Sequence, residues 1–349
     1  MSKFIVLVGT ILLFSCSSNK AKENNDTIAE SDNIEEVVES NYEEADKPEI
    51  SDSTTARISK RLVIGFDGTI DTYPIQMTLR FNESAKESLW GEYSYIRSKS
   101  KEKINIWGKF ISSDSIQLDE SHYNSAEKKS KVLAYLSGRF DSKYNLKGIW
   151  KDSATTKTLP LDIKPHIKEF HNNLDFDFVT TKDYDIYDDN PLSYENVSLL
   201  KEVKIKNKDK KVIQVLSELS VYIRDGEATI EFMDLNFDGY MDLAVNYIFP
   251  TRWKNDWGQL YFLYNPQTRA FERNRELETH EVIFVDYFNK TVKDVSADGS
   301  GNESTDAYIY SDGHFYLIKR EIWTEEGEYT IINYEVKDGV SVEVSREEK

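Results

Sequence analysis

The sequence has only one cysteine among its 349 residues, together with five histidines, seven prolines and 15 glycines. A single cysteine excludes an internal disulfide, a dithiol redox pair and a cysteine-rich zinc site. The histidines show no paired-ligand spacing such as HExxH, and neither a Gly-x-Ser-x-Gly elbow nor a phosphate-binding loop occurs. The sequence therefore singles out no catalytic residue and indicates a binding protein, although a glycosidase-type carboxylate pair stays open among its 62 acidic residues.

Basic residues are also scarce, since 44 Lys and Arg stand against 62 Asp and Glu and give a formal charge of −18. That charge repels phosphate backbones and anionic lipid headgroups, so it argues against nucleic-acid binding and electrostatic membrane docking. Aromatic residues are plentiful instead, with 6 Trp, 21 Tyr and 17 Phe. Because each ring buries a large apolar surface, the chain can build substantial cores, and its length suits two ordinary domains.

The first residues carry an apolar run that is too short to span a bilayer. Residues 4–14 are uncharged, follow Lys3 and lead into Leu13-Phe14-Ser15-Cys16. This order resembles the signal peptide of bacterial lipoproteins, with an ordinary secretory signal as the alternative. The resemblance implies that residues 1–15 are removed and that Cys16 carries a diacylglyceryl thioether and an N-linked acyl chain such as palmitate.

A charged segment follows the predicted lipidation site. Residues 17–58 hold 12 acidic and four basic side chains and one aromatic residue, Tyr42. Such a composition cannot bury enough apolar surface to fold, so residues 16–58 are expected to form a disordered acidic tether. A flexible chain of this length reaches about 35 Å. The protein is thus predicted to be held in the cell envelope by its N-terminal lipid, with the outer membrane as the expected membrane.

The next region, residues 59–166, repeats a pattern of apolar-x-Gly-x-aromatic. Four copies are centred on Gly91, Gly108, Gly138 and Gly148, and a looser copy is centred on Gly68. Side chains at i, i+2 and i+4 share one face of a strand, and glycine there lets a sheet coil tightly. The pattern predicts a small antiparallel β-barrel or half-barrel. Its rings either fill the barrel, which we consider the more common case, or line a ligand cavity.

Residues 167–349 read as a second, propeller-like β domain. Strand-like runs recur from Val212 onward, and Asp-Gly pairs at 225/226, 312/313 and 338/339 fall between runs, where tight turns are expected. Residues 196–219 also fit two turns of helix, and that alternative stays open. The expected fold class is all-β throughout.

One motif in this second region has the spacing of a cation site. In the nine residues from Asp234 to Asp242, oxygen side chains stand at positions 1, 3, 5 and 9 and Gly239 stands at position 6. This matches the start of a calcium loop, in which the main-chain carbonyl of position 7, Tyr240, also turns inward. Position 12 is Val245 and the flanks alternate as strands, so the loop is not an EF-hand. We predict a structural calcium ion, against an Asx-rich turn that binds no metal, with these ligands: Asp234, Asn236, Asp238, Tyr240 and Asp242.

The calcium loop is followed by Trp257-Gly-Gln-Leu-Tyr-Phe-Leu-Tyr-Asn-Pro-Gln-Thr-Arg-Ala-Phe271 and by Asn274-Arg-Glu-Leu277. This succession resembles a family of bacterial lipoproteins and periplasmic proteins. Some of its members are immunity proteins against peptidoglycan-hydrolysing effectors, and they are similar to the periplasmic inhibitors of invertebrate-type lysozyme. The resemblance implies a propeller-like β fold, bound calcium on the same five residues and a lysozyme-like hydrolase as partner.

The same inhibitors insert a Ser-Gly-x-x-Tyr loop into the lysozyme cleft. The nearest match here is Ser300-Gly301-Asn302-Glu303-Ser304, with Tyr308 four residues later. By this resemblance Ser300, Gly301 and Tyr308 are the candidate partner-binding residues. Two hypotheses follow: a membrane-anchored inhibitor or immunity protein, or an envelope lipoprotein that binds a glycan or another protein without inhibition.

Overall fold

The computed structural model describes residues 57–82, 88–98, 102–124, 129–171, 173–181, 197–224, 227–249, 257–280 and 282–349. The predicted signal peptide, Cys16 and the tether lie outside these residues. Regular structure within the described ranges is all β, apart from a single 3₁₀ turn, η2 (Leu277–Thr279). The predicted fold class is therefore confirmed. No helix in the described part of the chain has the length and apolar character needed to cross a membrane.

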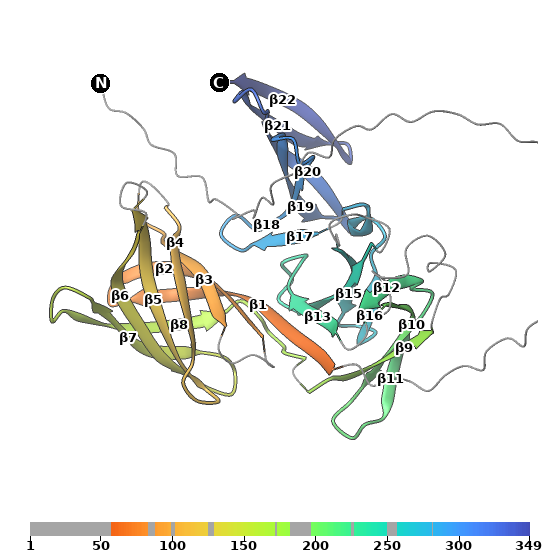
Figure 1. Ribbon diagram of the computed structural model, residues 1–349, viewed down its shortest axis with the longest axis horizontal. Helices are drawn as coiled ribbons and strands as arrows, with labels where there is room; N and C mark the ends of the chain where they lie inside the picture. The colour runs from red at the N-terminus through yellow and green to blue at the C-terminus, as the bar shows by residue number, and fades with distance from the viewer. Residues whose placement is uncertain are drawn as a thin grey trace, which may run out of the picture. The chain divides into compact units, whose positions relative to one another are not determined.

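Eight consecutive antiparallel strands form a closed barrel (Figure 1). Closure comes from β1 and β8, which pair from Phe66 opposite Pro165 to Ile70 opposite Leu161. The barrel strands are β1 (Arg57–Ile70), β2 (Tyr73–Asn82), β3 (Leu89–Tyr95), β4 (Ile104–Phe110), β5 (Ser115–Asn124), β6 (Lys129–Phe140), β7 (Leu146–Asp152) and β8 (Thr158–Pro165).

The repeated glycines lie where neighbouring barrel strands approach each other most closely. A Cβ atom on Gly91 would lie 2.0 Å from the carbonyl oxygen of Thr78, and one on Gly108 would lie 1.9 Å from that of Gln117. No side chain fits at such a distance, so these positions require glycine. The apolar and aromatic members of the pattern face inward, where rings pack against one another; the centroids of Phe110 and Phe140, for example, are 6.2 Å apart. The rings thus fill the barrel.

Strand β1 connects the barrel to a second set of strands. Its first half leaves the barrel and pairs in parallel with β13, from Arg57 opposite Glu227 to Leu62 opposite Phe232. The predicted boundary at residue 166 follows the end of β8, yet β1 contributes to both sides and Ile50–Lys349 forms one compact unit. The added strands are β9 (Asp175–Thr181), β10 (Val197–Lys206), β11 (Val212–Leu216), β12 (Val221–Arg224), β13 (Glu227–Met233), β14 (Asp242–Ile248), β15 (Trp257–Asn265) and β16 (Ala270–Arg273).

The helical alternative for residues 196–219 does not occur, because this stretch contains strands β10 and β11. Strand β10 buries Leu200, Val203 and Ile205 and pairs with β9, β11 and β12. Pairing on both edges gives its backbone the hydrogen bonds that a short amphipathic helix would have made internally.

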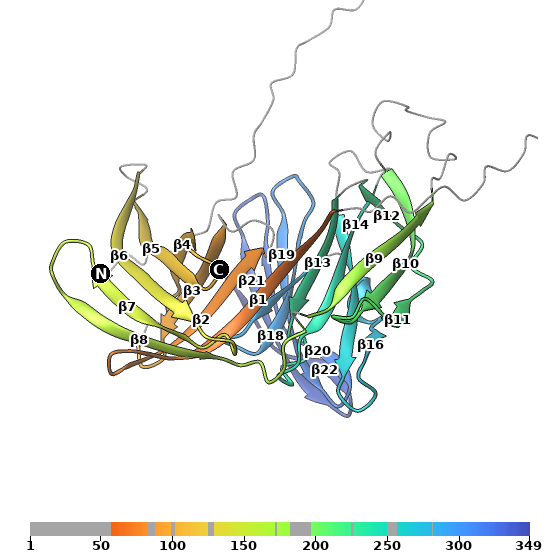
Figure 2. The ribbon, with the colours of Figure 1, turned by 90° about the horizontal axis from the view of Figure 1, so that it is seen from below.

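About the last fifth of the chain forms a separate six-stranded antiparallel meander (Figure 2). Two of its hairpins turn at the predicted Asp-Gly pairs: Asp312 and Gly313 have φ of 50° and 88°, and Asp338 and Gly339 have φ of 51° and 75°. The pair at 225/226 lies outside the described residues. The strands are β17 (Ile283–Asp286), β18 (Thr291–Ala297), β19 (Glu303–Ser311), β20 (His314–Trp323), β21 (Tyr329–Lys337) and β22 (Val340–Glu348).

Two hydrophobic cores organise these sheets. The larger one fills the barrel and continues between the strands from β9 to β16. The smaller one lies between β13 to β15 and the meander, and it includes Val63, Met233, Tyr261, Val285 and Tyr287. Val63 belongs to β1, so one strand contributes to both cores and fixes the barrel against the meander.

Candidate functional site

The candidate calcium loop, residues 234–242, connects β13 to β14 and is wound tightly around its first carboxylate. Asp234 is 2% exposed; its Oδ1 accepts from the main-chain N–H of Asp238 at 3.1 Å and its Oδ2 from that of Gly239 at 2.9 Å. Phe237 and Gly239 have φ of 57° and 88°, which turns the chain sharply here. The glycine predicted for the turn therefore stands where the backbone needs it.

The other predicted ligands lie around the same turn. Asn236 Oδ1 accepts from the Asp238 N–H at 3.2 Å, while Asp238 Oδ1 accepts from the Tyr240 N–H at 2.8 Å. Asp242 is completely buried, and its two oxygens accept from the N–H groups of Leu235 at 2.7 Å and Tyr264 at 2.8 Å. The structure thus gathers the side chains of positions 1, 3 and 5, whereas Asp242 closes the loop onto its start and onto β15.

Burial dominates the electrostatics of this loop. It raises the pKa of Asp234 to about 7 and the pKa of Asp242 well above its ordinary value, and neighbouring carboxylates raise both further. Within the described residues no basic side chain forms an ion pair with Asp234, Asp238 or Asp242. Lys168 instead donates to the main-chain oxygen of Asp238 at 2.5 Å.

These all-oxygen donors suit a hard divalent cation such as calcium. Their present arrangement is that of a hydrogen-bonded Asx turn, and in the described part of the chain no three His, Cys, Asp or Glu side chains converge on a metal position. Calcium binding by this loop stays a prediction.

The residues predicted to contact a partner do not form one site. Ser300 and Gly301 are exposed in the turn between β18 and β19, where Asp298 Oδ1 accepts from the main-chain N–H and the hydroxyl of Ser300, both at 2.8 Å. Tyr308 lies in β19 opposite Val292, half-buried against the ring of His280. Its hydroxyl donates to Asp306, so Tyr308 belongs to the sheet and not to the turn.

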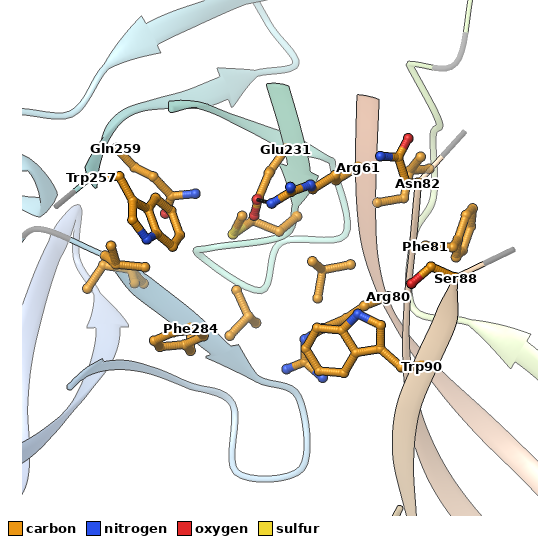
Figure 3. Close-up of a pocket in the computed structure, with 16 residues that line it drawn as sticks. Arg61, Arg80, Phe81, Asn82, Ser88, Trp90, Glu231, Trp257, Gln259 and Phe284 are labelled. Atoms are coloured by element: carbon orange, nitrogen blue, oxygen red, sulfur yellow. Dashed lines mark hydrogen bonds and ion pairs between the residues drawn. The ribbon is translucent and has the colours of Figure 1, made fainter. Parts of the chain in front are cut away.

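A cleft of about 510 Å³ opens on another part of the molecule, within the volume range of small-molecule sites. The cleft is surrounded by strands β1, β2 and β3 of the barrel, by β13 and β15, and by β17 together with Val282, the residue before it (Figure 3). The lining residues are Arg61, Leu62, Val63, Arg80, Phe81, Asn82, Ser88, Trp90, Glu231, Met233, Trp257, Gln259, Val282, Ile283, Phe284 and Val285.

Three large rings at the cleft remain open to solvent. Trp90 is 39% exposed, Trp257 is 40% exposed and Phe284 is 44% exposed. Trp90 is supported from behind by Trp107, its partner on β4, with the ring centroids 5.9 Å apart and nearly parallel. Large exposed aromatic rings gathered at one concave site are typical of binding surfaces.

The charged groups of the cleft are two arginines and one glutamate. Arg61 Nη1 donates to Glu231 Oε1 at 3.1 Å, as the dashed line in Figure 3 marks. The guanidinium of Arg80 lies 4.6 Å from the centre of the Trp90 ring. Glu231 is the single carboxylate among the described lining residues, so the cleft does not assemble a glycosidase-type pair there.

Sequence reasoning missed this cleft, because its walls come from segments more than 200 residues apart in the chain, such as Arg61 and Val285. One local signal was present. Trp90 occupies an x position of the repeated pattern, on the outward face of a strand, where a polar residue is expected.

No protein-family model matches this sequence, and no curated protein matches it at a significant level. A Xanthomonas protein related to the type IV secretion system is 14% identical with a TM-score of 0.38, over 59% of this chain and 96% of that one. A levansucrase of Bacillus subtilis is 11% identical with a TM-score of 0.25, over 87% and 89% of the two chains. The periplasmic gluconolactonase of Pseudomonas aeruginosa is 10% identical with a TM-score of 0.20, over 82% and 83%. All three scores lie below 0.5, where a match carries no implication for function.

Proposed function

We propose that this chain is a lipid-anchored binding protein of the cell envelope that recognises a saccharide in the cleft beside the barrel. The observation that carries the proposal is the combination of three exposed rings with planar polar side chains around one concave site. Sugar rings present C–H faces that pack on aromatic surfaces and hydroxyl groups that both donate and accept hydrogen bonds. At the cleft, the guanidinium groups of Arg61 and Arg80 supply donors and the carboxylate of Glu231 supplies an acceptor.

Two sequence features support this proposal: the predicted lipid anchor supports the location in the cell envelope, and the candidate calcium loop supports a rigid cleft wall. Lipidation at Cys16 and the acidic tether would hold the folded part close to the membrane while leaving the cleft open to ligand. A structural calcium ion at residues 234–242 would neutralise the buried carboxylates at the end of β13. Because Glu231 and Met233 of β13 line the cleft, a rigid loop at the end of this strand would also make one wall of the cleft more rigid.

Calorimetric titration of the mature protein with a panel of neutral and acidic oligosaccharides tests the function. Trp257→Ala should weaken the binding on the order of 10-fold, because an aromatic contact contributes about 0.5–1.5 kcal/mol beyond its buried area. Trp323→Ala is the matched control, since Trp323 is 38% exposed but packs on Tyr329 in the meander and does not line the cleft. A panel in which no saccharide binds would refute the proposal.

An inhibitor or immunity protein is the second candidate, and one observation favours it. The exposed turn at Ser300 and Gly301 is held by Asp298, which also accepts from the Asn302 side chain at 2.6 Å. A loop ordered in advance loses little entropy when it enters an enzyme cleft. Under this hypothesis, the protein abolishes the lytic activity of a muramidase at equal molarity and Ser300→Ala relieves the inhibition. Full activity of every tested muramidase at excess protein would exclude the hypothesis.

A further inference from the structure

Arg80 is the one guanidinium of the cleft that has no partner among the described residues. Arg61 is paired with Glu231, but the side chain of Arg80 makes no hydrogen bond or salt bridge to any described residue. It is half-buried in β2, and its guanidinium carbon lies over the ring of Trp90. Figure 3 shows its nitrogen atoms beside that ring, on the side that faces Phe284.

An unpaired and half-buried arginine is unusual, because a guanidinium gives up water on burial and normally gains charged acceptors in return. Burial lowers the pKa of Arg80, while the more distant Glu92, Asp286 and Glu231 partly oppose this. The guanidinium nevertheless stays protonated at neutral pH. Trp90 contacts the group without accepting a hydrogen bond from it, and the N–H groups that can bind a carboxylate in a bidentate manner have no acceptor among the described residues.

We infer that the saccharide bound in the cleft carries a carboxylate and that Arg80 binds this group. The inference rests on the proposed saccharide function and specifies its ligand class. Asn82 and Gln259 are neutral and Arg61 is compensated by Glu231, so Arg80 supplies the uncompensated charge of the described lining. The formal charge of −18 is spread over the whole chain, and salt screens it beyond about 8–10 Å.

Uronic acids carry such a carboxylate on the ring itself, and sugars with a lactyl ether substituent carry it on that substituent; the test compares these two sources. The first arm of the test compares an oligogalacturonate with its methyl ester, in which a methyl group on each carboxylate removes the charge. The second arm compares N-acetylmuramic acid with N-acetylglucosamine, which lacks the lactyl group. The arm in which the acid binds about 10- to 100-fold more tightly identifies the source, since a hydrogen bond to a charged group is worth that factor.

Substitutions at the cleft then assign the preference to Arg80. Arg80→Met keeps an apolar stem beside Trp90 and should abolish the preference for the acid, so that the acid and the neutral sugar bind with equal affinity. Arg80→Lys should retain part of it, because the charge remains but the bidentate geometry is lost. Arg275→Met is the control, because Arg275 is exposed and pairs with Glu278 away from the cleft.

Glu231→Gln provides a gain-of-function test. It releases Arg61 from its ion pair and removes the carboxylate of the cleft, so the acidic sugar should bind several-fold more tightly. Equal affinity for acid and neutral sugar in both arms, or an acid preference that survives Arg80→Met, would overturn the inference while leaving saccharide binding in place. Absence of binding by all four sugars, together with a panel that yields no ligand, would instead overturn the proposed function and the inference with it.

Discussion

The hydroxyl of Tyr287 connects three segments that are distant in the sequence, and its removal is the sharpest test of the fold. Tyr287 follows β17 and is 2% exposed. Its hydroxyl donates to the carbonyl oxygen of Val63 in β1 at 2.9 Å and accepts from the main-chain N–H of Asp234 at 3.0 Å. Its ring lies over Gly65, where an added Cβ would approach the ring to 2.5 Å. One side chain thus joins the barrel, the candidate calcium loop and the meander.

Tyr287→Phe keeps the ring and removes only this bridge. A buried carbonyl and a buried N–H then lose their partner, and each such loss costs about 1–3 kcal/mol. Two such losses together are expected to lower the free energy of unfolding by about 2–6 kcal/mol. This is a large fraction of the roughly 5–15 kcal/mol that stabilises a folded protein.

Urea unfolding followed by circular dichroism measures the change. Tyr73→Phe is the matched control, since Tyr73 is 53% exposed and its loss of a hydroxyl should change stability by less than about 0.5 kcal/mol. A Tyr287→Phe protein as stable as the Tyr73→Phe protein would refute the bridging role. Gly65→Ala should destabilise through the same ring, by steric overlap instead of lost hydrogen bonds.

Three further predictions concern charge, metal and anchor. Burial alone would raise the pKa of Asp286, but Lys293 at 2.7 Å and Lys103 at 3.5 Å hold it at about 2. Because that pKa lies below the unfolded value of about 3.9, Asp286 stabilises the fold by about 2 kcal/mol above pH 4, and this contribution is lost as the pH falls toward 2. Asp286→Asn should therefore flatten the plot of unfolding free energy against pH between pH 4 and 2. An unchanged slope of that plot would contradict the ion pairs. A calcium site with a dissociation constant near 10⁻⁴ M adds about 2.7 kcal/mol to the free energy of unfolding at roughly 10 mM calcium. EDTA should therefore lower the midpoint of thermal unfolding, and Asp238→Asn should remove the difference between the midpoints with and without EDTA. Equal midpoints of the unsubstituted protein with and without EDTA would exclude a stabilising ion. Cys16→Ser should move the protein from the detergent phase to the aqueous phase in Triton X-114 partition, and retention in detergent would exclude lipid anchoring at this cysteine.

Local patterns of the sequence were sufficient to predict the strands and several turns. Alternation with a period of two is a property of each strand alone, so the barrel strands and the meander hairpins could be anticipated. The turns at 312/313 and 338/339 were predictable for the same reason, since their backbone requirements are local, whereas the need for glycine at 91 and 108 comes from the carbonyl oxygen of a neighbouring strand. Residues 196–219 were ambiguous, because a short apolar run fits a helix and a strand equally until its pairing partners are known.

The sequence by itself determined the all-β class, the strand-and-turn periodicity and the grouping of oxygen donors between Asp234 and Asp242, because each depends on residues close together in the chain. Only the tertiary structure decided that β1 divides itself between barrel and sheet, that Tyr287 bridges to Val63, and that Arg80 and Trp90 face Trp257 and Phe284 across one cleft. Those arrangements depend on pairing and packing between distant segments, which no spacing along the chain encodes.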